Sequence, residues 1–211
     1  MRRPCGNTTP LLTFPVERST RSRRSSDLRH NATVPTGITT IELSDRERRE
    51  ITGYAADCAR RTLPIFEEER PADTRARDAI DAAHAFADGG RRTAALRQSA
   101  WAAYRAAQET VSPAAADAAR AASHAAAAAY LHPRASAHQV KHLLGAAAHA
   151  ARAEELVCDE DRSVIGATLE WARRHAPPAV SAVLGRLPAA PAGGGRIGEL
   201  IRTLDAALRR G

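Results

Sequence analysis

Aromatic residues, lysine and cysteine are all scarce in this 211-residue chain, and each shortage excludes something. Aromatic side chains make up only 4% of the residues, so large rings cannot fill most of a core. Lys141 is the only lysine among 31 basic residues, and such an arginine bias is typical of GC-rich coding. The net charge of +7 is therefore weak evidence for nucleic-acid binding. The three cysteines lie far apart, with neither a CxxC pattern nor a disulfide framework, which fits a reducing cytoplasm.

Long apolar runs and known catalytic motifs are also missing. Asp117, Arg120 and His124 interrupt the longest alanine tract, so it does not predict a membrane span. No G-x-S-x-G elbow, Walker loop or cysteine–histidine nucleophile pair occurs. Residues 193–198 match G-x-G-x-x-G formally, but a Pro/Ala-rich linker precedes them instead of a strand. We therefore expect a cytoplasmic protein that is not an enzyme, with no catalytic residue, no cofactor and no membrane partner.

Alanine is what the sequence has in abundance, with 19 of the 37 residues from 94 to 130. Alanine is the best helix former, and no segment alternates well enough to be a strand. We predict an all-α fold, a compact bundle of seven or eight helices. The first should begin at the capping box of Ser44 and Glu47, and its Pro64 should kink or break it. The others are expected over residues 73–88, 91–111, 113–132, 138–156, 161–175, 179–187 and 196–210.

Residues 1–42 differ from the rest of the chain. They contain four prolines and no periodicity, and seven arginines against three acidic residues give them a charge of +4. We predict a disordered basic tail over residues 1–42, or an upstream extension, that is dispensable for the helical domain over residues 43–211. The arginine-rich run 18–29 is either a solvated tail, the interpretation we favour, or a contact for nucleic acid or anionic lipid.

The predicted helix 138–156 has two unlike faces. An apolar stripe should be buried: Val140, Leu143, Leu144, Ala147 and Ala151. The opposite face carries three histidines around a glycine: His138, His142, Gly145, His149 and Arg152. A glycine inside a helix costs roughly 1 kcal/mol, so we expect another backbone to approach Gly145 and to cover this face in part. If the face is open instead, it is the first candidate for partner binding, with Lys141, His142, His149 and Arg152 as contacts.

Two further groups of residues have alternative interpretations. His138 and His142 have the i,i+4 spacing of zinc ligands, but Gln139 stands where a zincin needs Glu, and no third ligand is evident. We expect no metal site, and interpret these histidines as a polar face or a hydrogen-bonded helix seam. Trp101 and Tyr104 share one side of their helix and could stack a ligand or partner. In a chain this poor in aromatics, we expect them to fill the core.

Six segments of the sequence, in this order, resemble segments of a known protein family. They are LPIFE (63–67), DGGRRTAALRQSAWAAYRAA (88–107), YLHP (130–133), QVKHLLGAAAHAARA (139–153), EWARRHAPPAV (170–180) and PAGGGRIGELIRTLDAALR (191–209). Over residues 43–211 the chain resembles a bacterial family described as putative immunity proteins of polymorphic-toxin systems. The resemblance rests on the rarer residues in these segments rather than on alanine. It implies a helical protein that binds and neutralises a cognate protein toxin, and it defines no catalytic residue.

We therefore predict an immunity protein that occludes a toxin's active site stoichiometrically with a preformed helical face. The alternative is a helical nucleic-acid-associated or regulatory protein that uses the arginine-rich tail, and a third possibility is an enzyme with an unrecognised site. Surface charge separates the first two. Binders of basic nuclease toxins usually present an acidic patch, whereas a nucleic-acid protein needs a contiguous basic one.

Overall fold

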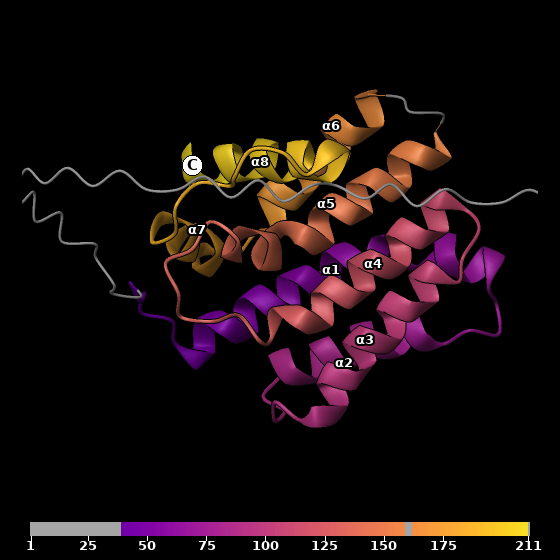
Figure 1. Cartoon of the computed structure of the whole chain (residues 1–211), viewed down its shortest axis with the longest axis horizontal. Helices are drawn as coiled ribbons and strands as arrows, with labels where there is room; N and C mark the ends of the chain where they lie inside the picture. The colour runs from indigo at the N-terminus through magenta and orange to yellow at the C-terminus, as the bar shows by residue number, and fades with distance from the viewer. Residues whose placement is uncertain (1–38, 159–161, 211) are drawn as a thin grey trace, which may run out of the picture. The chain divides into compact units, whose positions relative to one another are not determined.

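The computed structural model describes residues 39–158 and 162–210, and these form eight α-helices (Figure 1). They are α1 (Asp45–Glu69), α2 (Arg75–Ala87), α3 (Ala94–Gln108), α4 (Pro113–Ala128), α5 (Gln139–Val157), α6 (Arg162–His175), α7 (Pro178–Gly185) and α8 (Gly195–Arg210). The prediction of an all-α fold with seven or eight helices is confirmed. In the described ranges, extended pairing is limited to one isolated bridge between Thr40 and Arg134. No helix in this part of the chain is long and apolar enough to cross a membrane.

Side-chain caps fix where several helices begin. The predicted capping box opens α1: Ser44 Oγ accepts the Glu47 amide N–H (3.1 Å), and Glu47 Oε2 accepts the Ser44 amide N–H (2.8 Å). The hydroxyls of Thr93 and Ser112 accept amide N–H groups at the starts of α3 and α4. These bonds satisfy amides that have no partner inside a helix. The ends are less exact, since α3 and α4 stop at residues 108 and 128 rather than 111 and 132.

The first helix passes through Pro64 and continues to Glu69, so the proline does not break it. A bend at Pro64 stays a prediction. The side chains of Leu63 and Phe66, on either side of the proline, are both buried in the core. This burial holds the chain helical across a residue that removes one backbone hydrogen bond.

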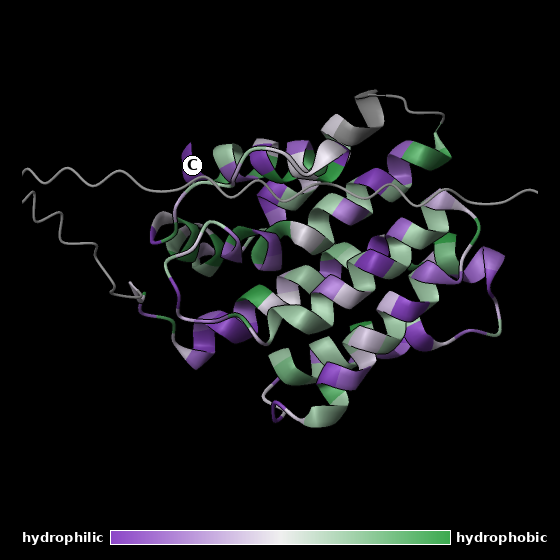
Figure 2. Ribbon diagram, viewed as in Figure 1, coloured by the Kyte–Doolittle hydropathy of each residue, from purple (hydrophilic) through white to green (hydrophobic). Residues whose placement is uncertain are grey.

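The alanine-rich helix α4 is the centre of the fold. It packs against α1, α2, α3 and α5, and it lies between α3 and α5 in Figure 1. All its buried residues are alanine except Asp117. Figure 2 accordingly shows α4 as mostly pale green, the colour of weakly hydrophobic residues. A helix that is apolar nearly all round needs neighbours on most sides, and small side chains let those neighbours come close.

The apolar stripe predicted for α5 is buried. Val140, Leu143 and Leu144 have no exposed surface, and Ala147 and Ala151 are at most 2% exposed. The glycine on the opposite face is buried too. A Cβ atom added to Gly145 would lie 2.5 Å from Nδ1 of His124 on α4. The neighbour that requires glycine is therefore an imidazole side chain of an adjacent helix, not the backbone that the sequence suggested.

Most of the predicted tail lies outside the described residues. Its last four residues do not, and they contact the helical part. Ile41 donates its amide N–H to the Pro133 carbonyl (3.2 Å), and Thr39 accepts the Ala135 amide N–H (2.8 Å). Arg186 donates to the Glu42 carbonyl. The boundary at residues 42 and 43 stays a prediction, but Thr39 and Ile41 are bonded to the loop between α4 and α5, and Glu42 is bonded to Arg186 at the end of α7.

Candidate functional site

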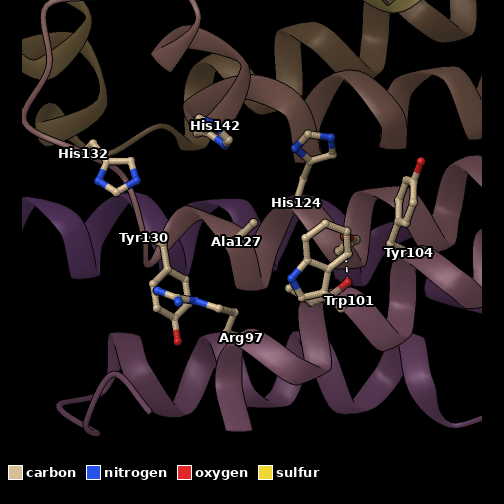
Figure 3. A pocket seen from close by; sticks show the side chains of 10 residues that line it. Arg97, Trp101, Tyr104, His124, Ala127, Tyr130, His132 and His142 are labelled. Atoms are coloured by element: carbon tan, nitrogen blue, oxygen red, sulfur yellow. Dashed lines mark hydrogen bonds between the residues drawn. The ribbon is translucent and has the colours of Figure 1, made fainter. Parts of the chain in front are cut away.

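A pocket of about 680 Å³ opens between α3, α4 and the first half of α5 (Figure 3). Its lining combines aromatic rings, imidazoles and alanine methyls, and contains no carboxylate: Arg97, Ala100, Trp101, Tyr104, Ser123, His124, Ala127, Tyr130, His132 and His142. In Figure 3, His132, His142 and His124 follow one side of the pocket, and Arg97 and Trp101 lie on the other. We call this the aromatic pocket.

Trp101 and Tyr104 are not in the core, contrary to the sequence-based expectation. Trp101 is 59% exposed and Tyr104 is 40% exposed, and their rings meet edge to face at 6.0 Å. The stripe that α3 buries consists of Leu96, Ala100, Ala103, Ala106 and Ala107. One leucine and four alanines make the buried face of α3, and the two large rings lie on its outer side. A large exposed ring pair beside a pocket is typical of a binding surface.

Tyr130 lies beside Arg97 at one end of the pocket, and two arginines contact its ring (Figure 3). Its hydroxyl donates to the Thr93 carbonyl (2.5 Å). The Arg97 guanidinium lies 4.4 Å from the centre of its ring, and Arg92 lies 5.8 Å from it. Arg92 also donates to the Ala129 carbonyl (3.3 Å). Stacking on a ring holds a guanidinium in place without neutralising its charge, so Arg97 reaches the pocket as an oriented cation.

His124 lies at the inner end of the pocket, against α5. Its Nδ1 atom is buried and has no hydrogen-bond partner, and its ring stacks on His149 at 5.0 Å. Burial, together with the charges of His149, His142 and Lys141, lowers the pKa of His124 to about 3. This side chain is therefore a neutral imidazole at pH 7.

His149 forms a hydrogen bond with a carboxylate inside the protein. Its Nδ1 lies 2.8 Å from Oδ1 of Asp117, which also accepts from Arg120 (3.2 Å). Burial raises the pKa of Asp117, but the bonds to His149 and Arg120 outweigh burial and hold it below its usual value. An ionised carboxylate can only accept, so the Nδ1 atom of His149 carries the proton.

The four residues predicted to bind a partner do not share one surface. His142 lines the aromatic pocket, and Lys141 and His149 line a second pocket of about 380 Å³ between α5, the 190–194 loop and α8. Arg152 forms an ion pair with Glu155 (2.7 Å). Lys141 and His142 are exposed, whereas His149 and Arg152 are partly covered and have partners in the protein.

The two histidines with zinc-ligand spacing are also separated between the two pockets. His138 faces the second pocket and His142 the aromatic pocket, so the two imidazoles point into different spaces. In the described part of the chain, no group of three or more histidine, cysteine or carboxylate side chains is placed to hold a metal ion. Ser123, the one hydroxyl-bearing Ser or Thr in the aromatic pocket, donates to the Ala100 carbonyl (2.8 Å) rather than to a histidine.

Sequence reasoning placed the site on α5 and missed its α3 and α4 walls. The signal was present in the helical spacing. Arg97, Trp101 and Gln108 share a side with Tyr104, and two of these four residues are strongly polar. A side that combines polar residues with aromatic ones faces solvent, because the buried side of the same helix is uniformly apolar.

Comparisons with known proteins identify the family. No curated protein and no solved structure matches the chain. The family described as Imm-5 like putative immunity protein matches residues 42–179, which is more than half of the chain. The match takes in α1 to α6 and every residue that lines the aromatic pocket. The chain therefore belongs to the Imm-5 like putative immunity protein family.

Proposed function

We propose that this protein protects a bacterial cell by binding a cognate toxin in the cytoplasm and occluding it stoichiometrically, without catalysis. The observation that carries the proposal is the exposed Trp101–Tyr104 pair at the aromatic pocket of a chain from an immunity-protein family. His142 extends this surface onto α5, and Lys141 lies beside it at the second pocket. His149 and Arg152 would join it only by releasing their partners in the protein.

The chemistry of the pocket suits protein recognition. Tryptophan, tyrosine and arginine supply most of the binding energy in protein interfaces, and they do so from the middle of a patch. Here Trp101, Tyr104 and Arg97 lie together around a concave surface floored by alanine methyls. The floor is made by α3 and α4, which are packed on the rest of the bundle, so the surface is formed before the partner arrives.

The test is a binding and protection assay with the toxin encoded beside this gene. Co-expression should restore growth, and the purified proteins should form a one-to-one complex. Trp101→Ala should weaken the complex at least about 30-fold, mainly through faster dissociation, as loss of an interface anchor does. Trp101→Phe should recover part of the affinity.

The matched control is Val157→Ala, which trims another exposed apolar side chain at the far end of α5. It should leave the affinity unchanged. Equal affinities for the original protein and Trp101→Ala would place the binding surface elsewhere, and the absence of any complex would remove the proposal.

A second candidate function is nucleic-acid binding. The arginine-rich run 18–29, which is the sequence-based candidate for this function, lies outside the described residues. The observation that favours it is the lining of the aromatic pocket, which contains Arg97 and no carboxylate. A gel-shift assay with the full chain, single-stranded and double-stranded oligonucleotides tests it directly.

A further inference from the structure

The cations around the aromatic pocket have no carboxylate partners, unlike most arginines in the described part of the chain. Ion pairs elsewhere neutralise Arg46, Arg48, Arg60, Arg61, Arg75, Arg77, Arg120, Arg173, Arg186, Arg196 and Arg209. No such pair involves the exposed residues Arg97, Arg105 or Lys141. Arg97 lines the pocket, and Arg105 follows Trp101 by one helical turn. Lys141 precedes the pocket residue His142 and lines the second pocket, which shares His124 with the aromatic pocket.

We infer that the surface which docks on the aromatic pocket is an acidic protein segment, whose carboxylates meet Arg97, Arg105 and Lys141 while an uncharged side chain enters the pocket. The inference rests on the proposed function and names the chemistry of its partner. It runs opposite to the usual pairing of an acidic immunity protein with a basic nuclease, because here the immunity protein supplies the cations.

The interior of the pocket and its rim differ in charge. This difference sets where an uncharged side chain of the partner would bind and where its carboxylates would bind. Partial burial and the nearby charges of His132 and Lys141 lower the pKa of His142, and burial lowers that of His124 further. The inner wall of alanines and neutral imidazoles would therefore take an uncharged side chain without desolvating an unpaired charge. Carboxylates belong at the rim, where the guanidinium of Arg97 is already held on Tyr130 and loses little freedom on pairing.

The same features argue for an acidic protein segment over a nucleic acid. Proteins that bind single strands offer free aromatic faces on which bases stack. Tyr130 has its ring covered by Arg97, and the edge-to-face contact of Trp101 with Tyr104 (interplanar angle 86°) prevents the two from forming a parallel stacking platform. The lining of the pocket also contains a single arginine, Arg97, and not the row of cations that would follow a nucleic-acid backbone.

The experiment compares association rates of the full chain with the toxin encoded beside the gene, at about 50 mM and about 500 mM salt. Arg97→Gln should slow association about tenfold at low salt and much less at high salt, with a smaller change in dissociation. Lys141→Gln should act in the same direction. The matched control is Arg60→Gln, which removes a partly exposed arginine already paired with Asp81 on α2, and its rates should equal those of the original protein.

Each other outcome counts against the inference. Toxin binding that is insensitive to salt and to Arg97→Gln would overturn the acidic partner and leave the proposed function standing. Failure of the toxin to bind at all would overturn both. If a single-stranded oligonucleotide binds the Arg97 surface while the toxin stays bound elsewhere, the cations would be assigned to nucleic acid.

Discussion

At Gly145 the absence of one methyl group lets α4 and α5 come together. Glycine is unfavourable in a helix, but its Cα hydrogens leave room for the imidazole of His124, which any Cβ atom would overlap at 2.5 Å. That imidazole in turn stacks on His149, which holds Asp117. One missing side chain therefore positions a polar cluster between two alanine-rich helices.

We predict that Gly145→Leu lowers the free energy of unfolding, although leucine is the better helix former. The larger side chain must displace His124 or separate α4 from α5, and overpacking of this kind typically costs about 1–3 kcal/mol. Chemical denaturation measures the change. The matched control is Gly166→Ala in α6, where no atom lies within 4 Å of the added methyl group, and it should stabilise the protein by about 0.5–1 kcal/mol. A more stable Gly145→Leu protein would show that this face is open.

His124 makes stability depend on pH. The folded protein keeps this ring neutral down to a pKa of about 3, whereas the unfolded chain takes up a proton near 6.5. Unfolding therefore binds a proton below pH 6.5, and the stability that a neutral His124 contributes is full above that pH. It is lost as the pH falls toward 3, by up to about 1.4 kcal/mol per pH unit.

The measurement is the free energy of unfolding between pH 7 and pH 4. His124→Gln, which cannot take up the proton, should have a shallower pH dependence than the original protein. His138→Gln, at the exposed start of α5, should keep the original slope. Identical slopes for the original protein and His124→Gln would contradict the assignment. The groups that face the ring are His149, His142 and Lys141, with Asp117 behind His149.

At the scale of the helix, periodicity predicts a buried face well when that face has large side chains. The stripe of α5 contains valine and two leucines, and its burial was predictable. On α3 the buried stripe is one leucine and four alanines. Trp101 and Tyr104 are the largest apolar side chains of this helix, and the sequence-based expectation that they fill the core was wrong. Alanine gives little contrast between faces, and sequence alone does not show which neighbour a helix will meet.

The best test of the α5 stripe is Leu144→Ala. The side chain has no exposed surface. Its removal should lower the free energy of unfolding by about 2–5 kcal/mol, because the packed surroundings relax only partly into the cavity that it leaves. Urea titration followed by circular dichroism measures the loss. A cost below that of an exposed truncation such as Val157→Ala would mean that α5 is not central.

For the whole molecule, the sequence predicted the class of fold and the number of helices, but not the pocket. The pocket joins residues from α3, α4, the following loop and α5, and their meeting depends on how these helices pack. His124 gave no sequence signal, since its role comes from Gly145, 21 positions later. Spacing within one helix predicted a partner surface on α5, whereas the structure places His142 at one pocket, Lys141 and His149 at another, and Arg152 in an ion pair.

Truncation of the chain tests where the helical domain begins. Deletion of residues 1–38 should leave the thermal midpoint unchanged. Deletion of residues 1–42 should lower it, because the backbone bonds of Thr39 and Ile41 to the loop after α4 and the contact of Arg186 with the Glu42 carbonyl are lost. Differential scanning calorimetry compares the three proteins. Equal midpoints for all three would place the boundary after residue 42, and a drop on removing residues 1–38 would show that the tail packs on the domain.

The alanine core described for α4 also bears on how the protein responds to temperature. The heat capacity change of unfolding grows with the apolar surface exposed and falls with the polar surface exposed. Alanine exposes a full peptide group but only one methyl when the chain unfolds, so this protein should lie below the usual ~12–15 cal/mol/K per residue. Its stability curve should then be flat, losing little on cooling or on moderate warming. A bundle built from the smallest apolar side chain would thus keep its pocket formed over a wide range of growth temperatures.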